Sequence, residues 1–296
     1  MNVVSTSPSG TEILYALGVE PVAVSHSCDY PPAVAELPTI DTSRIDAEAS
    51  ADRHQQVEAS TRDGHVYRID PDVLRAVEPD LVLTQGVCGV CAVDESLIDE
   101  TLADLDVDPE VLALHASELS DLYDCIERVG RATGRGDRAE SLIGELQERV
   151  RSVEERASTR TASPGVAVFE WMDPPRLAGN WVPELIESAG GTPVLVEPGD
   201  RTSELDWQTF LDVAPEVIVV APCGFDVDHS EAQLHELADR DGWAELPAVQ
   251  QGRVYGVDGA AYFNRWTPRL TESLERLERI LTDEERALPD GVRRLT

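Results

Sequence analysis

The sequence contains no lysine, so all 24 basic residues are arginines, and they face 57 acidic residues for a formal net charge of −33. A nucleic-acid-binding protein needs a basic surface for the phosphate backbone, so this charge excludes that class of partner. The acidic residues are spread along the chain rather than gathered in one block. This spread favours the solvated acidic surface of a halophilic protein, whose repulsion is screened by salt, over a docking site for a basic partner.

Long apolar runs are also missing, and no stretch approaches the eighteen residues that a membrane-spanning helix needs. Five cysteines, an odd number in 296 residues, do not indicate a disulfide framework. The first expected strand begins at Asn2, which leaves no room for a signal peptide or a lipid-anchor cysteine ahead of it. We therefore expect a cytoplasmic protein with reduced thiols; an extracytoplasmic location would require a truncated start.

Catalytic signatures are absent as well. The sequence has no Gly-rich phosphate loop, no Gly-x-Ser-x-Gly and no His-Glu-x-x-His. We therefore expect a protein that is not an enzyme and that has no catalytic residues.

An internal repeat is present. Residues 70–83 and 206–219 each predict an Asp-capped helix, a turn with Pro and an acidic residue, and a buried strand, at a constant offset of 136 positions. A second pair of similar segments precedes them, since residues 11–18 and 183–190 each predict a helix that ends at glycine. Two matches in the same order indicate two lobes of one design.

The fold class that follows is α/β, with two Rossmann-like lobes, each a mostly parallel sheet flanked by helices, joined by a long α-helix. We expect an N-terminal lobe over residues 1–115, linking helices over 116–160 and a C-terminal lobe over 161–296. The linker predicts a short helix, a break at residues 134–136 and a long helix to about Ala157. Residues 43–68 are polar without clear periodicity and predict an insertion loop, and a last helix is expected from Pro268 to about Leu281.

Four cysteines follow predicted strands: Cys28, Cys88, Cys91 and Cys223. Ligands of open α/β sheets bind outside the carboxyl ends of the strands, so these thiols are expected to converge on one site. They could hold zinc, iron or a cluster, with His26 nearby, and Cys88-x-x-Cys91 could instead serve a redox enzyme. Each cysteine taken singly is better explained as a small buried residue at a tight turn, and only the four taken together give a functional role equal weight; Cys125, inside a linker helix, is expected to be core.

Aromatic residues are few, at 5% of the chain, yet many stand in loops after predicted strands. An aromatic platform with one arginine suits a flat ligand that has polar edges. Packing of the loops is the alternative, and it fits Trp207 and Trp266 best. The candidate loop residues are Tyr30, Glu170, Trp171, Trp181, Tyr262, Phe263 and Arg265.

Several motifs carry a resemblance. Residues 7–18 (SPSGTEILYALG), 28–32 (CDYPP), 79–82 (PDLV) and 265–270 (RWTPRL) resemble, in order along nearly the whole chain, the periplasmic cobalamin-binding and iron-siderophore-binding proteins of ABC importers. The TQxxCxVCA motif from Thr84 and the EWxDPP motif from Glu170 are similar to a branch labelled cobalamin-binding protein.

This resemblance implies the helical-backbone substrate-binding fold, with a ligand between two lobes, Arg265 beside it, and Tyr262 and Phe263 lining the cleft. It also implies docking on an ABC permease around Asp72 and Gln208. Three features depart from the family: the missing signal peptide, Gln208 where an acid is usual, and Gln85 where a tryptophan is expected.

The leading hypothesis is therefore non-catalytic binding of a corrinoid (cobalamin-like) or related metal chelate, by a monomer that could serve an ABC transporter. The alternatives are a cytoplasmic thiolate metal-binding protein, with zinc or iron on Cys28, Cys88, Cys91 and Cys223, or a redox enzyme using Cys88 and Cys91. The predicted ligand-binding residues are Cys28, Tyr30, Gln85, Cys88, Glu170, Trp171, Trp181, Cys223, Tyr262, Phe263 and Arg265.

Overall fold

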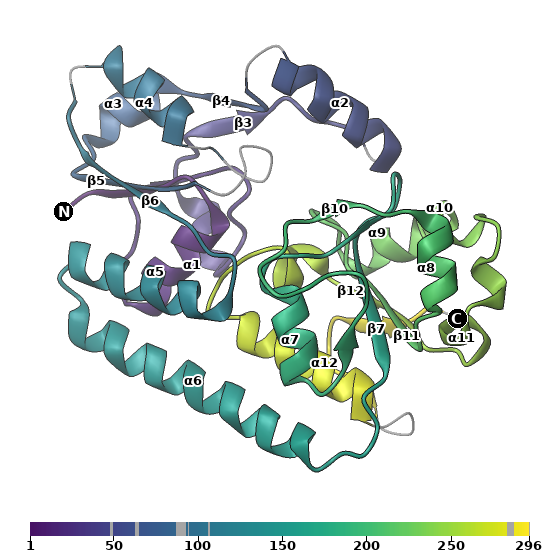
Figure 1. Cartoon of the computed structure of the whole chain (residues 1–296). Coiled ribbons are helices and arrows are strands. Elements are labelled where there is room, and N and C mark those ends of the chain that lie inside the picture. Colours follow the sequence, from purple (N-terminus) through teal and green to yellow (C-terminus); the bar gives the residue numbers. More distant parts are fainter. Residues whose placement is uncertain are drawn as a thin grey trace. The chain divides into compact units, whose positions relative to one another are not determined.

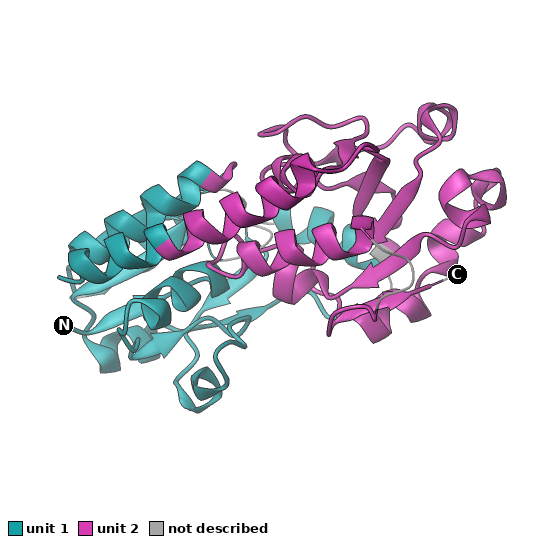
Figure 2. Ribbon diagram, turned by 90° about the horizontal axis from the view of Figure 1, so that it is seen from below, with its two compact units in different colours: residues 1–48, 52–116, 120–144 teal, residues 49–51, 117–119, 145–296 magenta. Residues whose placement is uncertain are grey.

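The computed structural model describes residues 1–47, 50–62, 65–86, 93, 95–105, 107–282 and 287–295. The chain divides into two compact units (Figure 2). Unit 1 comprises residues 1–48, 52–116 and 120–144, and unit 2 comprises residues 49–51, 117–119 and 145–296.

Unit 1 contains a four-stranded parallel sheet in the order β2-β1-β5-β6 (Figure 1). The strands are β1 (Val3–Ser5), β2 (Ala23–Val24), β5 (Leu81–Gln85) and β6 (Glu110–Leu114). The helices are α1 (Pro8–Ala16), α3 (Pro71–Val77), α4 (Glu95–Ala103) and α5 (Leu119–Ala132), with a 3₁₀ turn η1 (Pro32–Glu36). Strand residues Val4, Ala23 and Val82 pack with helix residues Leu74 and Ile98 in the core of this unit.

Unit 2 contains a larger mixed sheet in the order β10-β8-β7-β11-β12-β13, with β9 paired to β7. Its centre is parallel: β7 (Gly165–Trp171), β11 (Val217–Val220) and β12 (Val254–Val257). The remaining strands are β8 (Arg176–Leu177), β9 (Thr192–Pro193), β10 (Ser203–Glu204) and β13 (Val292–Arg294). The antiparallel strand β13, which pairs with β12, was not anticipated from the sequence.

The helices of unit 2 are α7 (Val182–Ser188), α8 (Trp207–Val213), α9 (Val227–Ala232), α10 (His235–Ala238), α11 (Pro247–Gln250) and α12 (Leu270–Thr282), with a 3₁₀ turn η2 (Trp243–Glu245) and a π-helical turn η3 (Gly259–Phe263). Phe169 of β7 packs edge-on against Phe210 of α8, with ring centroids 5.3 Å apart. Val220, Phe225 and Trp243 complete the centre of this core.

The internal repeat found in the sequence is also present in the structure. Asp70 caps α3 by accepting a hydrogen bond from the Asp72 amide, and Asp206 caps α8 by accepting one from the Thr209 amide. Both helices end at a left-handed residue, Glu78 in one and Ala214 in the other, and each is followed by a buried central strand. The predicted class, two α/β units that each have parallel strands at the centre of the sheet, is confirmed.

A long helix, α6 (Gly136–Ser158), follows α5 and continues from residues of unit 1 into residues of unit 2. The predicted break between the two helices is confirmed, because Gly134 adopts φ +69°, which favours glycine. Within unit 2, α6 is held to α12 by two-pronged ion pairs from Arg149 to Glu275 and from Arg156 to Glu278.

The expectation of a loop over residues 43–68 is wrong. This segment contains α2 (Ser50–Arg62), set between the antiparallel strands β3 (Asp41–Ser43) and β4 (Tyr67–Ile69). The helix is polar on all sides, which explains why no apolar periodicity marks it. Side-chain pairs one turn apart support it instead, from His54 and Arg62 to Glu58.

Candidate ligand-binding residues

The carboxyl edge of the unit 1 sheet is rich in small polar side chains. Thr6, directly after β1, hydrogen-bonds Thr84 of β5 through their hydroxyl oxygens at 3.1 Å. Ser7 accepts a hydrogen bond from the Gly10 amide and so caps α1. Gln85, the last residue of β5, is buried. Residues 87–92 lie outside the described part of the chain, so the predicted roles of Cys88 and Cys91 fall on residues that the structure does not describe.

The loop after β2 carries two predicted ligand residues, Cys28 and Tyr30. The Cys28 thiol is half-buried and lies 3.1 Å from the Thr11 hydroxyl of α1, and its amide donates to the Ser25 carbonyl. Tyr30 is exposed, with 46% of its surface accessible, although large apolar and aromatic side chains are mostly buried in this protein. This exposure keeps Tyr30 available to a ligand.

The same loop is bonded to β3 through a pair that the sequence analysis did not join, His26 of the loop and Asp41 of β3. The His26 Nδ1 atom lies 2.9 Å from an Asp41 carboxylate oxygen, which also accepts a hydrogen bond from the His26 amide. The other Asp41 oxygen accepts from the Ser25 hydroxyl at 2.8 Å. Sequence analysis placed His26 only beside the cysteines, and it gave no reason to single out Asp41.

In unit 2, the end of β7 brings Glu170 and Cys223 together. The Cys223 amide donates to the Glu170 carbonyl at 3.0 Å, and the Glu170 carboxylate accepts a hydrogen bond from the Thr202 hydroxyl at 2.5 Å. The neighbouring Trp171 is half-buried, its indole N–H donates to the Asp173 carbonyl, and its ring centroid lies 5.9 Å from that of Phe225. Three predicted ligand residues therefore share one edge of the unit 2 sheet.

Trp181 and Phe263 also meet. The Trp181 indole N–H donates to the Phe263 carbonyl at 2.9 Å, and only 6% and 1% of these residues are accessible. Both side chains are packed inside unit 2, so their rings expose little surface to a ligand. Their predicted role in ligand binding stays a prediction.

Tyr262 and Arg265 are more open. The Arg276 guanidinium lies 3.6 Å from the centroid of the Tyr262 ring, with the Arg269 guanidinium 5.8 Å away. Arg265 is half-buried in the segment between η3 and α12. The Glu170 carboxylate accepts the hydrogen bond from Thr202, and both Glu170 and Arg265 have further interactions.

The predicted cysteine site is not tested by this geometry, because Cys28 and Cys223 belong to different units. Among the described residues, no group of three or more His, Cys, Asp and Glu side chains is placed to hold a metal ion. Cys125 is buried, as expected, and this burial raises the pKa of its thiol to about 11.

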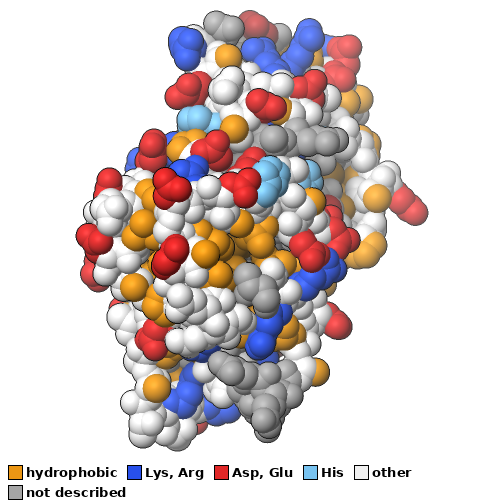
Figure 3. Space-filling view, turned by 90° about the vertical axis from the view of Figure 1, so that its right-hand side faces the viewer, with side chains coloured by type: hydrophobic (Ala, Val, Ile, Leu, Met, Phe, Trp, Pro, Cys, Tyr) orange, Lys and Arg blue, Asp and Glu red, His pale blue; other side chains and the backbone are white. Residues whose placement is uncertain are grey.

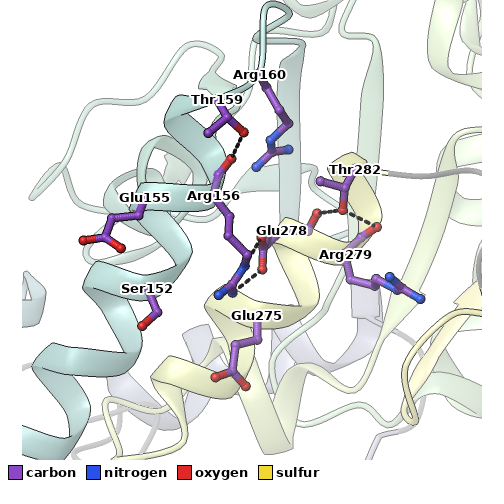
Figure 4. A pocket seen from close by; sticks show the side chains of 9 residues that line it. All are labelled: Ser152, Glu155, Arg156, Thr159, Arg160, Glu275, Glu278, Arg279 and Thr282. Carbon is purple, nitrogen blue, oxygen red and sulfur yellow. Dashed lines mark hydrogen bonds and ion pairs between the residues drawn. The ribbon is translucent and has the colours of Figure 1, made fainter.

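A polar hollow of about 760 Å³ lies between α6 and α12 and holds none of the predicted ligand residues (Figure 4). Arg156 crosses it to Glu278. The Arg160 Nε and Nη1 atoms are buried there without a hydrogen-bond partner among the described residues, while Nη2 donates to the Ala189 carbonyl. Burial lowers the pKa of Arg160. The hollow is thus lined mainly by charged groups, several of which already pair with each other.

The acidic side chains are scattered over the face drawn in Figure 3 rather than collected in one patch. This pattern agrees with the interpretation of a solvated acidic surface. None of the helices in the described part of the chain is both long enough and apolar enough to cross a lipid bilayer.

Residues 3–261 match the family described as "Periplasmic binding protein". The chain belongs to this family. The family is a non-catalytic substrate-binding component of ABC transporters, so the expectation of a protein that is not an enzyme is confirmed. Among the similar proteins, one relative is named a vitamin B12-binding protein and one solved structure is that of a periplasmic heme-binding protein.

The chain is 25% identical over 280 residues to an uncharacterized ABC transporter substrate-binding lipoprotein, YvrC, of Bacillus subtilis, covering 93% of this chain and 78% of the relative. It is 23% identical over 281 residues to the vitamin B12-binding protein of Vibrio cholerae, covering 93% and 87%. The solved structure of a periplasmic heme-binding protein from Pseudomonas aeruginosa has a TM-score of 0.73 at 18% identity, covering 98% of this chain and 96% of that one. The resemblance and the helical-backbone fold inferred from the sequence motifs are confirmed.

The predicted cytoplasmic location is wrong. The matched family is periplasmic, one relative is a lipoprotein, and the solved structures include periplasmic binding proteins. These findings point to an extracytoplasmic protein. The expectation rested on the position of Met1, and the start of a given sequence does not decide where the mature protein works.

Proposed function

We propose that this protein binds a corrinoid or a closely related metal chelate as the substrate-binding component of an ABC importer. The observation that carries the proposal is the similarity over 93% of the chain to a vitamin B12-binding protein. The residues at the carboxyl edges of the two sheets support it. The exposed Tyr30 and the half-buried Trp171 and Tyr262 provide aromatic surface, and Arg265 provides a cation for polar groups of the ligand.

The proposed contact residues are the eleven ligand-binding residues named from the sequence. One of them, Cys88, lies outside the described part of the chain. Tyr30, Trp171 and Tyr262 are the strongest, because their rings retain accessible surface. Trp181 and Phe263 are the weakest, because their rings are buried. Only the name of the vitamin B12-binding relative favours a corrinoid over heme and siderophore-type chelates, so the experiment must compare all three.

Titration followed in the visible region tests the proposal directly. Cyanocobalamin, aquacobalamin, hemin and a ferric tris-hydroxamate are each added to the purified full chain, and binding is measured in parallel by quenching of tryptophan fluorescence. We expect micromolar or tighter affinity for the cobalamins. No binding of either cobalamin at micromolar concentration would remove the corrinoid proposal, and binding of hemin alone would replace it with a heme-binding function.

We also propose that the protein is a monomer with lobes over residues 1–115 and 161–296 and linking helices over 116–160, and that a permease docks around Asp72 and Gln208. These two residues occupy the same place in the repeat, the second position of α3 and of α8, and both are exposed. Asp72 pairs with Arg75, and Gln208 donates to Asp212. The Asp212 carboxylate beside Gln208 supplies a negative charge near the position where the family usually has an acid.

Binding of zinc or iron by Cys28, Cys88, Cys91 and Cys223 remains a second candidate. Two half-buried cysteines that form no disulfide among the described residues, Cys28 and Cys223, favour it. Elemental analysis of protein purified without added metal tests it, and less than about one equivalent of bound metal would exclude a tetrahedral thiolate site. A redox enzyme using Cys88 and Cys91 does not fit a family whose members are non-catalytic.

A further inference from the structure

The loop after β2 is tied to a single buried carboxylate. None of the Asp41 side chain is accessible to solvent, whereas 32% of the His26 side chain is accessible. Three groups of the loop bond to Asp41: the Ser25 hydroxyl, the His26 amide and the His26 ring at Nδ1, at 2.8, 2.7 and 2.9 Å. A buried carboxylate needs such partners, and here one histidine supplies two of them.

These contacts fix which nitrogen of His26 is free. A carboxylate accepts hydrogen bonds and does not donate them, so the Nδ1 atom of His26 carries a hydrogen. In the neutral ring the lone pair is then on Nε2, which makes no hydrogen bond with any residue that the structure describes. The Tyr67 ring, 5.6 Å from the His26 ring and tilted by 47°, packs beside it and limits its rotation.

A histidine held through Nδ1 by a carboxylate, with Nε2 free, is the arrangement by which proteins orient a metal ligand. Here it cannot hold a bare ion, because a protein site for such an ion needs several ligands and no such cluster is found among the described residues. A metal that arrives inside its own chelate needs only one ligand from the protein. His26 meets that need, and it stands two residues after the end of β2, at the carboxyl edge of the sheet, where ligands of parallel sheets bind.

We infer that His26, held by Asp41, is an axial ligand to the metal of the bound chelate. This inference rests on the proposed function and narrows its substrate class to planar macrocyclic chelates with an exchangeable axial position. In the exchange, the bond between the metal and its axial water breaks, the Nε2 lone pair forms a new bond to the metal, and water is released. No proton or electron changes place. A chelate that fills every coordination position of its metal, such as a ferric tris-hydroxamate, cannot form this bond, so His26 should not strengthen its binding.

A purely structural role for the pair is the competing explanation, because Asp41 and His26 also join the loop to β3. The two roles differ in one readout: only axial coordination changes the visible spectrum of the chelate. Aquacobalamin and hemin have an exchangeable axial position, whereas in cyanocobalamin the upper position is already filled by cyanide. The spectrum of bound aquacobalamin or hemin should therefore change to that of an imidazole complex, while the spectrum of cyanocobalamin should not.

The variants are His26→Ala, His26→Gln and Asp41→Asn in the full chain, with His65→Ala as the matched control. His65 has nearly the same accessible fraction as His26, 28%, but its partner Glu100 is exposed. We expect His26→Ala and His26→Gln to abolish the spectral change, added imidazole to restore it in His26→Ala, and His65→Ala to retain it. Asp41→Asn should weaken binding of aquacobalamin or hemin about 10- to 100-fold, the usual cost of losing the group that orients a metal-binding histidine.

Fluorescence quenching measures binding separately from coordination, and far-UV circular dichroism shows whether each variant folds. Wild-type protein that binds aquacobalamin or hemin without a spectral change would overturn the inference and leave the proposed function standing. The same spectral change in His26→Gln as in wild type would also overturn it. Failure of every chelate to bind the wild-type protein would remove the proposed function, and this inference with it. A change seen with only one of aquacobalamin and hemin identifies the macrocycle.

Discussion

Asp80 and Glu216 each accept a hydrogen bond from a backbone amide at the beginning of a neighbouring strand, one in each half of the chain. The Asp80 carboxylate accepts a hydrogen bond from the Asn2 amide at 2.6 Å, and the Glu216 carboxylate accepts one from the Gly165 amide at 3.1 Å. In each unit the acid stands just before a central strand and holds the beginning of the neighbouring parallel strand, β1 in one unit and β7 in the other.

We therefore expect Glu216→Ala to lower the free energy of unfolding by about 0.5–1.5 kcal/mol, the usual net value of one hydrogen bond. Glu216→Gln is the control, because its amide oxygen still accepts from Gly165. Urea unfolding followed by circular dichroism gives both values. Equal losses in the two variants would show that the charge, not the hydrogen bond, is what matters.

Arg265→Ala is expected to keep the melting temperature of the free protein and to weaken binding of the chelate by about 1.5–3 kcal/mol, the range for a hydrogen bond to a charged group. The proposed reason is that the guanidinium fork contacts a polar group of the ligand. Thermal unfolding and fluorescence titration measure the two effects separately.

Arg276→Ala is the matched control for Arg265→Ala. Its guanidinium packs over Tyr262, so its loss should lower the melting temperature. A drop of similar size in ligand-free Arg265→Ala would instead identify that arginine as a structural latch.

Cys125 should resist alkylation in the native protein. Burial raises the pKa of its thiol to about 11, so at pH 8 the thiolate that reacts with iodoacetamide is scarce as well as inaccessible. A chain in which Cys125 is the one remaining cysteine isolates the effect. Labelling should be slow at pH 8 without denaturant and fast in urea, and rapid labelling of the folded chain at pH 8 would contradict the burial.

The pH dependence of stability follows from the same thiol. Because the folded-state pKa is raised, the unfolded chain ionises first as the pH increases, so the contribution of Cys125 is intact below about pH 9 and is lost toward pH 11. Cys125→Ala should show a flatter loss of melting temperature across this window than the parent chain.

The melting temperature should rise between dilute buffer and about 2 M KCl, because salt screens the repulsion among carboxylates. With 57 acidic residues against 24 arginines, this screening acts over the whole surface. A melting temperature that does not change with KCl would show that the acidic surface is not an adaptation to salt.

The fold could be predicted from the sequence where helix caps and apolar runs recur in both halves of the chain. Asp70 and Asp206 predicted the starts of two helices, and the apolar runs after Pro79 and Pro215 predicted two buried strands. The helix α2 was missed because its polar residues carry no stripe of apolar side chains, and β13 was missed because a three-residue edge strand with two arginines has little sequence signal.

The candidate site was readable only in part. The strand-end rule selected the loop that holds Cys28 and Tyr30, but it could not select Asp41. That residue is one of 57 acids, and only the pairing of β3 with β4 and its burial beside His26 set it apart from the rest. Contacts between segments that are distant in the chain depend on packing, and local sequence patterns do not contain them.

The clamp between α6 and α12, made of the ion pairs Arg149–Glu275 and Arg156–Glu278, is resistant to alkali. Both of its cations are guanidinium groups, and hydrogen bonds to Glu275 and Glu278 raise the pKa of Arg149 and Arg156 above their already high ordinary value. No alkaline condition that a cell meets can discharge them. Both cations of the clamp therefore stay charged in alkaline media, and alkali does not open this helix pair.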